Sequence, residues 1–172
     1  MMSLDEIYDA HVTYVWRVLR RLGVPPSSLE DAVQDVFVAL HRRLGDFEGR
    51  SSVRSWVFGF ALRVARDHRR RATRKGGLVP LSDELPASGQ PGPLELAERS
   101  ERLTLLRALL DGLDEERREV FVLIELEQLS APEVAEMLAL NVTTVHSRLR
   151  TARQEIERQL DRRRAAEARI AR

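Results

Sequence analysis

The stretch SAPEVAEMLALNVTTVHSRLRTAR, residues 130–153, decides how the C-terminal part of this chain folds. Ser130 is a candidate N-cap, and Pro132 and Glu133 fall in the first turn, where a missing N–H and a negative charge are favourable. Asn141 is a second N-cap candidate. Apolar residues recur at helical spacing in both segments, at Val134, Ala135 and Leu138 and then at Val142, Val145, Leu149 and Ala152. Two short helices joined by a tight turn predict a helix-turn-helix.

The second of these helices carries polar side chains opposite its apolar stripe. Hydroxyl, imidazole and guanidinium groups near a helix N-terminus suit the base edges and phosphates of a DNA major groove. The candidate DNA-binding residues, with the cap included, are Asn141, Thr143, Thr144, His146, Ser147, Arg148 and Arg150. The alternative is an ordinary helical hairpin with a solvated basic face.

The composition limits the classes of protein to which the chain can belong. With 172 residues it is long enough for one domain or two small ones, and 5% aromatic residues suit helical packing better than a β-sandwich. The absence of cysteine excludes disulfides and thiolate zinc ligation. Short apolar runs and a start charged by Asp5 and Glu6 predict no membrane span and no signal peptide. We therefore expect a cytoplasmic protein without membrane insertion.

The net charge of +1 conceals strong local imbalances. Residues 61–75 hold seven basic side chains against one acidic, whereas residues 111–136 hold nine acidic against two basic. Residues 148–172 are again basic, with nine arginines against four acids. Two basic blocks separated by acidic ones indicate two surfaces that face polyanions. The alternative, which we prefer for the last dozen residues, is that helix-end arginines serve the helix dipole and solubility.

A proline- and glycine-rich stretch divides the chain. Residues 76–93 hold four glycines and four prolines without a sustained apolar period, which predicts a linker. The predicted organisation is an N-terminal domain at 1–75, the linker at 76–93 and a C-terminal domain at 94–172.

The N-terminal part predicts three helices. The first runs from Leu4 to Leu22 and ends before Gly23, and the second is opened by Ser28 and Asp31 as a capping-box variant. The second buries Leu29, Val33, Val36, Phe37, Leu40 and Leu44. The third, capped by Ser52, buries Val53, Trp56, Val57, Phe60, Ala61, Val64 and Ala65. Its other side carries arginines that suit nucleic acid or, equally, solvent, at Arg54, Arg63, Arg66, Arg69 and Arg70.

The C-terminal part begins with a helix near residues 94–110, and a second helix starts at 114–116. No segment alternates as a strand would, so the fold class is all-α: two small helical domains joined by a Pro/Gly-rich linker, the C-terminal one a helix-turn-helix. The sequence holds no metal-ligand spacing, no phosphate-binding glycine loop and no clustered nucleophile and base. We therefore expect no enzymatic activity, no metal and no cofactor.

The run DAVQDVFVALHRRLGDFEGRSSVRSWVFGFALRVARDHRRR, residues 31–71, followed by the linker and the helix-turn-helix, resembles bacterial RNA polymerase sigma factors. The two-domain build is similar to the extracytoplasmic-function (ECF) group, and the resemblance covers roughly residues 8–160. It implies a protein that binds core RNA polymerase, recognises the −35 and −10 promoter elements and helps to melt DNA. A stand-alone helix-turn-helix regulator acting as a dimer is the alternative.

The resemblance also implies roles for particular residues. The set that matches the helix docking on the polymerase β′ clamp is Asp31, Gln34, Asp35 and Phe37, although core packing is an alternative for Phe37. The set that matches −10 recognition and melting is Gly49, Ser51, Ser52, Arg54, Trp56, Arg63, Arg66, Arg69 and Arg70. Core packing is an alternative for Trp56 as well. The polar residues from 141 to 150 match the −35 recognition helix.

The implied partners are core RNA polymerase (β′ clamp helices and β flap), promoter DNA and an anti-sigma factor. Four positions depart from the family pattern, so the promoter sequence does not follow from the resemblance. Arg63 stands where Asn is common, Ala139 and Thr143 where Gly is frequent, and His146 where Lys is common.

Overall fold

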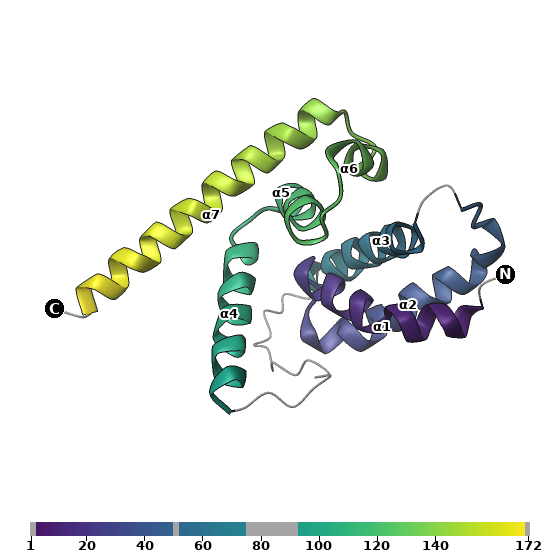
Figure 1. Ribbon diagram of the computed structural model, residues 1–172, viewed down its shortest axis with the longest axis horizontal. Helices are drawn as coiled ribbons and strands as arrows, with labels where there is room; N and C mark the ends of the chain where they lie inside the picture. Colours follow the sequence, from purple (N-terminus) through teal and green to yellow (C-terminus); the bar gives the residue numbers. More distant parts are fainter. Residues whose placement is uncertain (1–2, 50–51, 75–92, 171–172) are drawn as a thin grey trace. The chain divides into compact units, whose positions relative to one another are not determined.

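The computed structural model of the chain describes residues 3–49, 52–74 and 93–170, and the regular elements of these residues are all helical (Figure 1). The chain divides into two compact units, residues 1–89 and 90–172, which are described separately. The predicted linker lies outside the described residues except for Pro93, which begins a helix.

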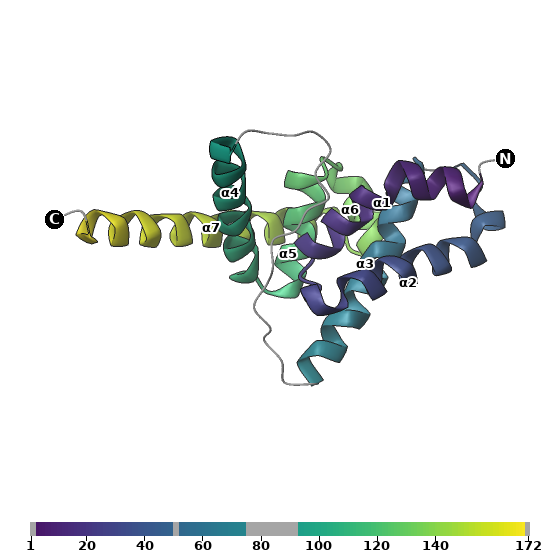
Figure 2. The same cartoon turned by 90° about the horizontal axis from the view of Figure 1, so that it is seen from below.

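The first unit is a three-helix bundle. Its elements are α1 (Leu4–Arg21), η1 (Pro26–Ser28), α2 (Leu29–Arg42), η2 (Leu44–Asp46) and α3 (Val53–Arg74). Each of α1, α2 and α3 packs against the other two (Figures 1 and 2). The shared core includes fully buried side chains from all three helices, among them Ile7, Val15, Val18, Leu19, Val36, Leu40, Val57, Phe58 and Ala61.

Helix α1 begins at Leu4 as predicted and ends at Arg21, with the predicted last residue, Leu22, as its C-cap. Ser3 and Glu6 form a capping box in which the Ser3 N–H donates to Glu6 Oε2 at 2.7 Å and the Glu6 N–H donates to Ser3 Oγ at 3.2 Å. Gly23 follows the helix with φ of 87°, a left-handed conformation that glycine adopts without strain.

The predicted capping box of α2 is wrong. Ser28 ends the 3₁₀ turn η1, and its side chain makes no capping hydrogen bond. The chain instead enters α2 through backbone bonds, in which the Ser28 N–H donates to the Pro25 carbonyl at 3.0 Å and the Leu29 N–H to that of Pro26. The turn satisfies donors that a side-chain cap would otherwise serve.

The buried face of α3 is rotated from the predicted stripe. Trp56, Phe60 and Val64 are only half-buried. The buried residues are Val57, Phe58, Ala61, Leu62, Ala65 and His68. Because α3 packs on both α1 and α2, it buries two adjacent rows of side chains, and the prediction found only one. The Ser52 cap is confirmed, since its Oγ accepts the Ser55 N–H at 3.1 Å.

The second unit contains the helix-turn-helix. Its elements are α4 (Pro93–Asp111), α5 (Glu115–Phe121), the π-helical turn η3 (Val122–Leu126), α6 (Ala131–Leu138) and α7 (Val142–Ile170). Helices α4, α5 and α6 all pack on α7. The core of this unit is formed by aliphatic side chains, among them Val120, Val122, Leu123, Val134, Val145, Leu149 and Ala152.

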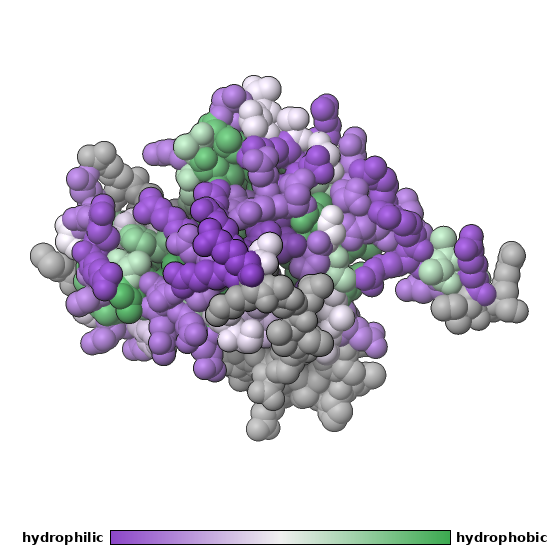
Figure 3. All heavy atoms as spheres, turned by 180° about the vertical axis from the view of Figure 1, so that it is seen from behind, coloured by the Kyte–Doolittle hydropathy of each residue, from purple (hydrophilic) through white to green (hydrophobic). Residues whose placement is uncertain are grey.

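Helix α7 extends well beyond the predicted helix-turn-helix, to Ile170. The side chains from 161 to 169 are all exposed, and ion pairs such as Arg162–Glu155 (3.0 Å) and Arg164–Asp161 (3.5 Å) run along this part. Hydrophilic side chains dominate the face of the molecule in Figure 3, with green hydrophobic atoms confined to small patches. Among the described residues, no helix combines the length and apolar character that crossing a membrane requires.

Candidate nucleic-acid and polymerase interfaces

The helix-turn-helix is held by two side-chain caps. The Ser130 N–H donates to Glu133 Oε2 at 2.8 Å and the Glu133 N–H donates to Ser130 Oγ at 3.4 Å, so Ser130 and Glu133 form a capping box on α6. The Ser130 hydroxyl also donates to Glu133 Oε2 at 2.6 Å, and this bond, together with that from the Ser130 N–H, lowers the pKa of Glu133. Asn141 Oδ1 accepts the Thr144 N–H at 2.7 Å and caps α7. Both predicted caps are confirmed, and between them Ala139 turns the chain with φ of 55° and ψ of 46°.

The structure separates the predicted α7 residues into two groups. Exposed side chains at i, i+3, i+4 and i+7 share one side of the helix, which we name the recognition face: Thr143, His146, Ser147 and Arg150. Thr144 and Arg148 are half-buried beside this face. Asn141 is exposed, but its side-chain oxygen is engaged in the cap.

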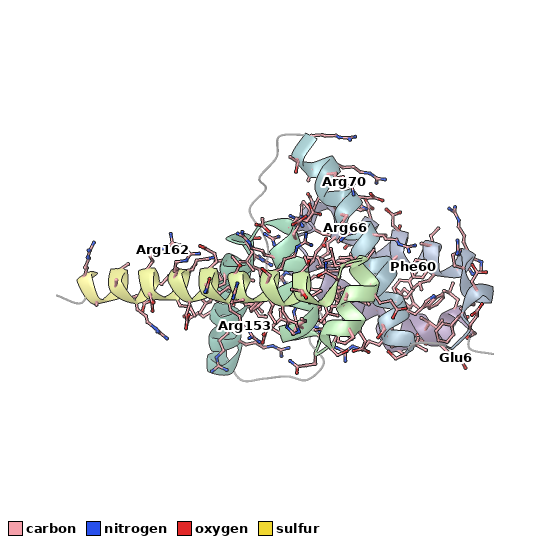
Figure 4. All side chains as sticks on the ribbon, turned by 90° about the horizontal axis from the view of Figure 1, so that it is seen from above. Glu6, Phe60, Arg66, Arg70, Arg153 and Arg162 are labelled. Atoms are coloured by element: carbon pink, nitrogen blue, oxygen red, sulfur yellow. The ribbon has the colours of Figure 1, made fainter. Side chains whose placement is uncertain are left out.

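Arg148 is bound to the neighbouring helix. Its Nη2 lies 2.7 Å from Glu116 Oε2 of α5, and its side chain is 24% exposed. Further along α7, the Arg153 Nε donates to Glu125 Oε1 at 2.8 Å. Figure 4 shows Arg153 and Arg162 in succession along α7. Glu125 belongs to the π-helical turn η3, so α5 and η3 each bind α7 through one carboxylate.

A row of arginines follows one side of α3, with Arg63 and Arg70 exposed and Arg66 half-buried. Arg63, Arg66 and Arg70 stand at i, i+3 and i+7, and we name them the basic row (Arg66 and Arg70 are labelled in Figure 4). Beside this row lies an aromatic cluster, in which the Trp56 ring centroid is 5.0 Å from that of Phe47 and 5.1 Å from that of Phe60. Trp56 is half-buried, so one part of its ring packs and another part is accessible.

Two of the predicted arginines do not lie in the basic row. The Arg54 guanidinium carbon is 4.6 Å from the centroid of the Tyr14 ring on α1, so this side chain packs across the bundle. Burial, together with the charge of Arg54, lowers the pKa of His11. Arg69 stands at i+6 from Arg63 and therefore falls outside the i, i+3, i+7 spacing of the row.

The loop before α3 is only partly described. Gly49 is exposed with φ of 72°, and no atom lies within 4 Å of the position that a Cβ would occupy. Ser51 lies outside the described residues. Ser52 is exposed and contributes its Oγ to the cap of α3.

Helix α2 presents an exposed polar face. Asp31, Gln34 and Asp35 are all exposed there, whereas Phe37 is 6% exposed and its ring centroid is 4.7 Å from that of Tyr8. Phe37 is therefore a packing residue, as the alternative interpretation had it. Val38, which was not predicted as a site residue, is 49% exposed and stands at i+4 from Gln34 on the same face. We name Asp31, Gln34, Asp35 and Val38 the α2 face.

A second residue missed by the sequence analysis is His68 of α3. Its side chain is 8% exposed, and its Nε2 lies 2.8 Å from Asp35 Oδ2 on the α2 face. Its spacing at i+3 from Ala65 and i+7 from Ala61 places it on the buried side of α3, which is the signal that could have found it.

Comparison with known protein families matches each unit to one family model. Residues 7–75 match Sigma-70 region 2, and residues 103–156 match Sigma-70, region 4. The chain is 34% identical over 166 residues to the RNA polymerase sigma factor CnrH of Cupriavidus metallidurans, covering 92% of this chain and 87% of that protein. It is 28% identical over 171 residues to the RNA polymerase sigma factor YlaC of Bacillus subtilis, covering 97% and 99% of the two chains.

Two solved structures are similar to this chain over most of its length. One is CnrH in complex with the cytosolic domain of CnrY, with a TM-score of 0.64 and 31% identity over 92% of this chain and 87% of that one. The other is the sigma factor RpoE in complex with the anti-sigma factor NepR from Bartonella quintana. Its TM-score is 0.68 at 21% identity, over 91% of this chain and 96% of that one, which shows a shared fold.

Proposed function

This chain belongs to the sigma-70 family of RNA polymerase sigma factors, in its ECF group, and from that membership we propose how its residues divide promoter and polymerase binding among three surfaces. Sigma factors are transcription initiation factors and not enzymes. The protein binds core RNA polymerase and directs initiation at promoters by recognising the −35 and −10 elements and helping to melt the DNA. Its relatives favour this function over that of a dimeric regulator. We place its action in the cytoplasm, with the polymerase.

The first surface is the recognition face of α7, which contacts the −35 element. Its hydroxyl and imidazole groups at Thr143, His146 and Ser147 lie in the first turns of the helix, which enter the major groove in helix-turn-helix proteins. Arg150 is exposed at the same side and supplies a cation for a phosphate or for guanine. An arginine on guanine discriminates by about 1–3 kcal/mol against the wrong base.

The second surface joins the basic row and the aromatic cluster of the first unit, and it contacts the −10 element. Three arginines on one side of α3 neutralise phosphates of the displaced strand. Unstacking a base costs a few kcal/mol, and the accessible part of the Trp56 ring, with Phe60 beside it, offsets this cost by stacking. Gly49 and Ser52 border this surface from the preceding loop.

The third surface is the α2 face, which docks on the β′ clamp helices of core polymerase. The two carboxylates and the amide of this face can bind arginines of a partner helix. Val38, one helical turn after Gln34 and Asp35, is exposed and adds an apolar contact beside them. Phe37 supports this face from inside the bundle rather than touching the partner.

We also propose that an anti-sigma factor regulates this protein. Support comes from CnrH, which is 31% identical in sequence and whose solved structure is a complex with the cytosolic domain of CnrY. Co-purification of the full chain with a candidate partner tests this proposal. A partner that acts as an anti-sigma factor must also abolish the binding of this chain to core polymerase.

The observation that carries the functional assignment is the match of regions 2 and 4, in order, to the two helical units. Transcription with purified core polymerase tests it, because adding this chain must produce initiation at defined promoters. Arg150→Ala must reduce promoter binding while leaving affinity for core polymerase unchanged. Asp31→Ala must reduce affinity for core polymerase while leaving the binding of −35 DNA by the chain unchanged. Failure of the wild-type chain to bind core polymerase would contradict the assignment.

A further inference from the structure

We propose that His68 is a positioning residue for polymerase docking, because it orients the carboxylate of Asp35 on the α2 face. The inference rests on the proposed docking function of that face and goes further, since it assigns a part in docking to a residue of α3.

The contact joins a buried group to an exposed one. His68 Nε2 and Asp35 Oδ2 are 2.8 Å apart, while the His68 side chain is 8% exposed and that of Asp35 is 52% exposed. The imidazole is held within the packing of α2 against α3, so its nitrogen is fixed in space. The carboxylate bonded to it is therefore restricted in rotamer, although it stands on a solvent-facing side of the helix.

This restriction matters because docking otherwise has to immobilise the Asp35 side chain. An aspartate on an exposed helix face samples several rotamers, and ordering it on binding lowers affinity. His68 holds one carboxylate oxygen of Asp35, and the side chain of Asp35 is half exposed. The second oxygen is therefore held in a defined orientation in which it can bind a cation of the partner. Orientation of this kind is worth about three- to tenfold in affinity.

An apolar residue at position 68 would fill the same space and would need no hydrogen-bond partner. The buried imidazole does need one, because an unpaired buried polar atom destabilises the fold, and Asp35 provides it. Helix α3 thus carries the basic row on one side and, on its buried side, the support for the α2 face.

A double-mutant cycle on the full chain tests the inference, with affinity for core RNA polymerase as the measurement. The variants are His68→Leu, Asp35→Ala and the two combined. We expect His68→Leu to weaken binding by about three- to tenfold in the wild-type background, and to have no further effect once Asp35 is alanine. His68→Gln, whose amide can donate to the same carboxylate, must restore affinity to within about twofold of the wild type.

Each other outcome overturns the inference in a recognisable way. If His68→Leu weakens binding equally with and without Asp35, then His68 acts through packing. If the helicity or the thermal midpoint of the His68→Leu variant falls, the same cycle is measured with His68→Phe, which keeps an aromatic ring at this position. Alanine at Asp31 and at Val38 tests the α2 face without involving His68. If neither of them nor Asp35→Ala changes core affinity, the docking surface itself is wrong and the inference fails with it.

Discussion

Arg148 of α7 is bound to Glu116 of α5, with its Nη2 2.7 Å from Glu116 Oε2. Arg150, two residues further on, lies instead on the recognition face and is exposed. A carboxylate beside a guanidinium cancels much of its attraction for phosphate. The two arginines therefore differ in what they contribute to DNA binding, although the sequence places both in the same basic run.

We predict that Arg150→Ala weakens binding to −35 duplex DNA more than Arg148→Ala does. If Arg150 binds a phosphate, its loss lowers the slope of log affinity against log salt by about 0.9, and the loss of Arg148 lowers it by less. Fluorescence anisotropy over a salt series measures both slopes. Equal slopes for the two variants would show that DNA displaces Glu116 from Arg148.

Arg54 is predicted to act on the bundle rather than on the −10 strand, because its guanidinium packs over Tyr14. Arg54→Ala must weaken binding to single-stranded −10 DNA less than the matched variant Arg63→Ala, which removes a charge from the basic row. A loss as large as that of Arg63→Ala would place Arg54 among the DNA contacts.

The pKa of His11 gives a second readout of Arg54. Burial and the charge of Arg54 hold this pKa below its ordinary value of 6.5, so the Arg54→Ala variant must raise it. Because the folded pKa is depressed, the contribution of neutral His11 to stability is complete above pH 6.5. It is lost as the pH falls through the lowered value. Titration of the His11 ring by NMR measures the shift in both proteins.

The helix boundaries followed from local chemistry, and the sequence therefore predicted most of them. Ser52, Ser130 and Asn141 each accept a backbone N–H in the structure, as their positions indicated. The exception is Ser28, where backbone bonds from the 3₁₀ turn replace the side-chain cap. Caps depend on residues a few positions apart, which is the range over which a single sequence is informative.

The direction of side chains could not be predicted in the same way, because it depends on distant elements. Phe58 is fully buried since α3 packs on two helices, and Arg148 is turned aside by a carboxylate from α5. The pairing of His68 with Asp35 spans 33 positions along the chain. Period and composition predicted the surfaces, but only the packed bundle separates the residues that face a partner from those that face a neighbouring helix.

The capping box of α6 is predicted to make the helix-turn-helix sensitive to acid. Ser130→Ala must destabilise the second unit by about 1 kcal/mol at neutral pH. The pKa of Glu133 is lowered by its bonds to Ser130, so its contribution is complete above pH 4.5 and is lost as the pH falls through the lowered value. The difference between wild type and Ser130→Ala in chemical denaturation must therefore shrink in that range. A constant difference would mean that the Glu133 carboxylate adds nothing to the cap.

Ala139 occupies a backbone conformation that suits glycine, with φ of 55° and ψ of 46°. The turn needs this conformation, because the Ala139 N–H then donates to the Glu136 carbonyl at 3.2 Å and the Leu140 N–H to that of Ala135 at 2.8 Å. An L-residue in the left-handed region destabilises the folded state by about 1–2 kcal/mol, which glycine avoids. Glycine also raises the entropy of the unfolded chain, and this offsets part of the gain. Ala139→Gly must therefore stabilise the second unit by about 0.5–1 kcal/mol. The matched change Ala108→Gly, in the right-handed helix α4, must destabilise it by about 1 kcal/mol. Urea unfolding of both variants measures these differences, and destabilisation by Ala139→Gly would show that the turn carries no strain.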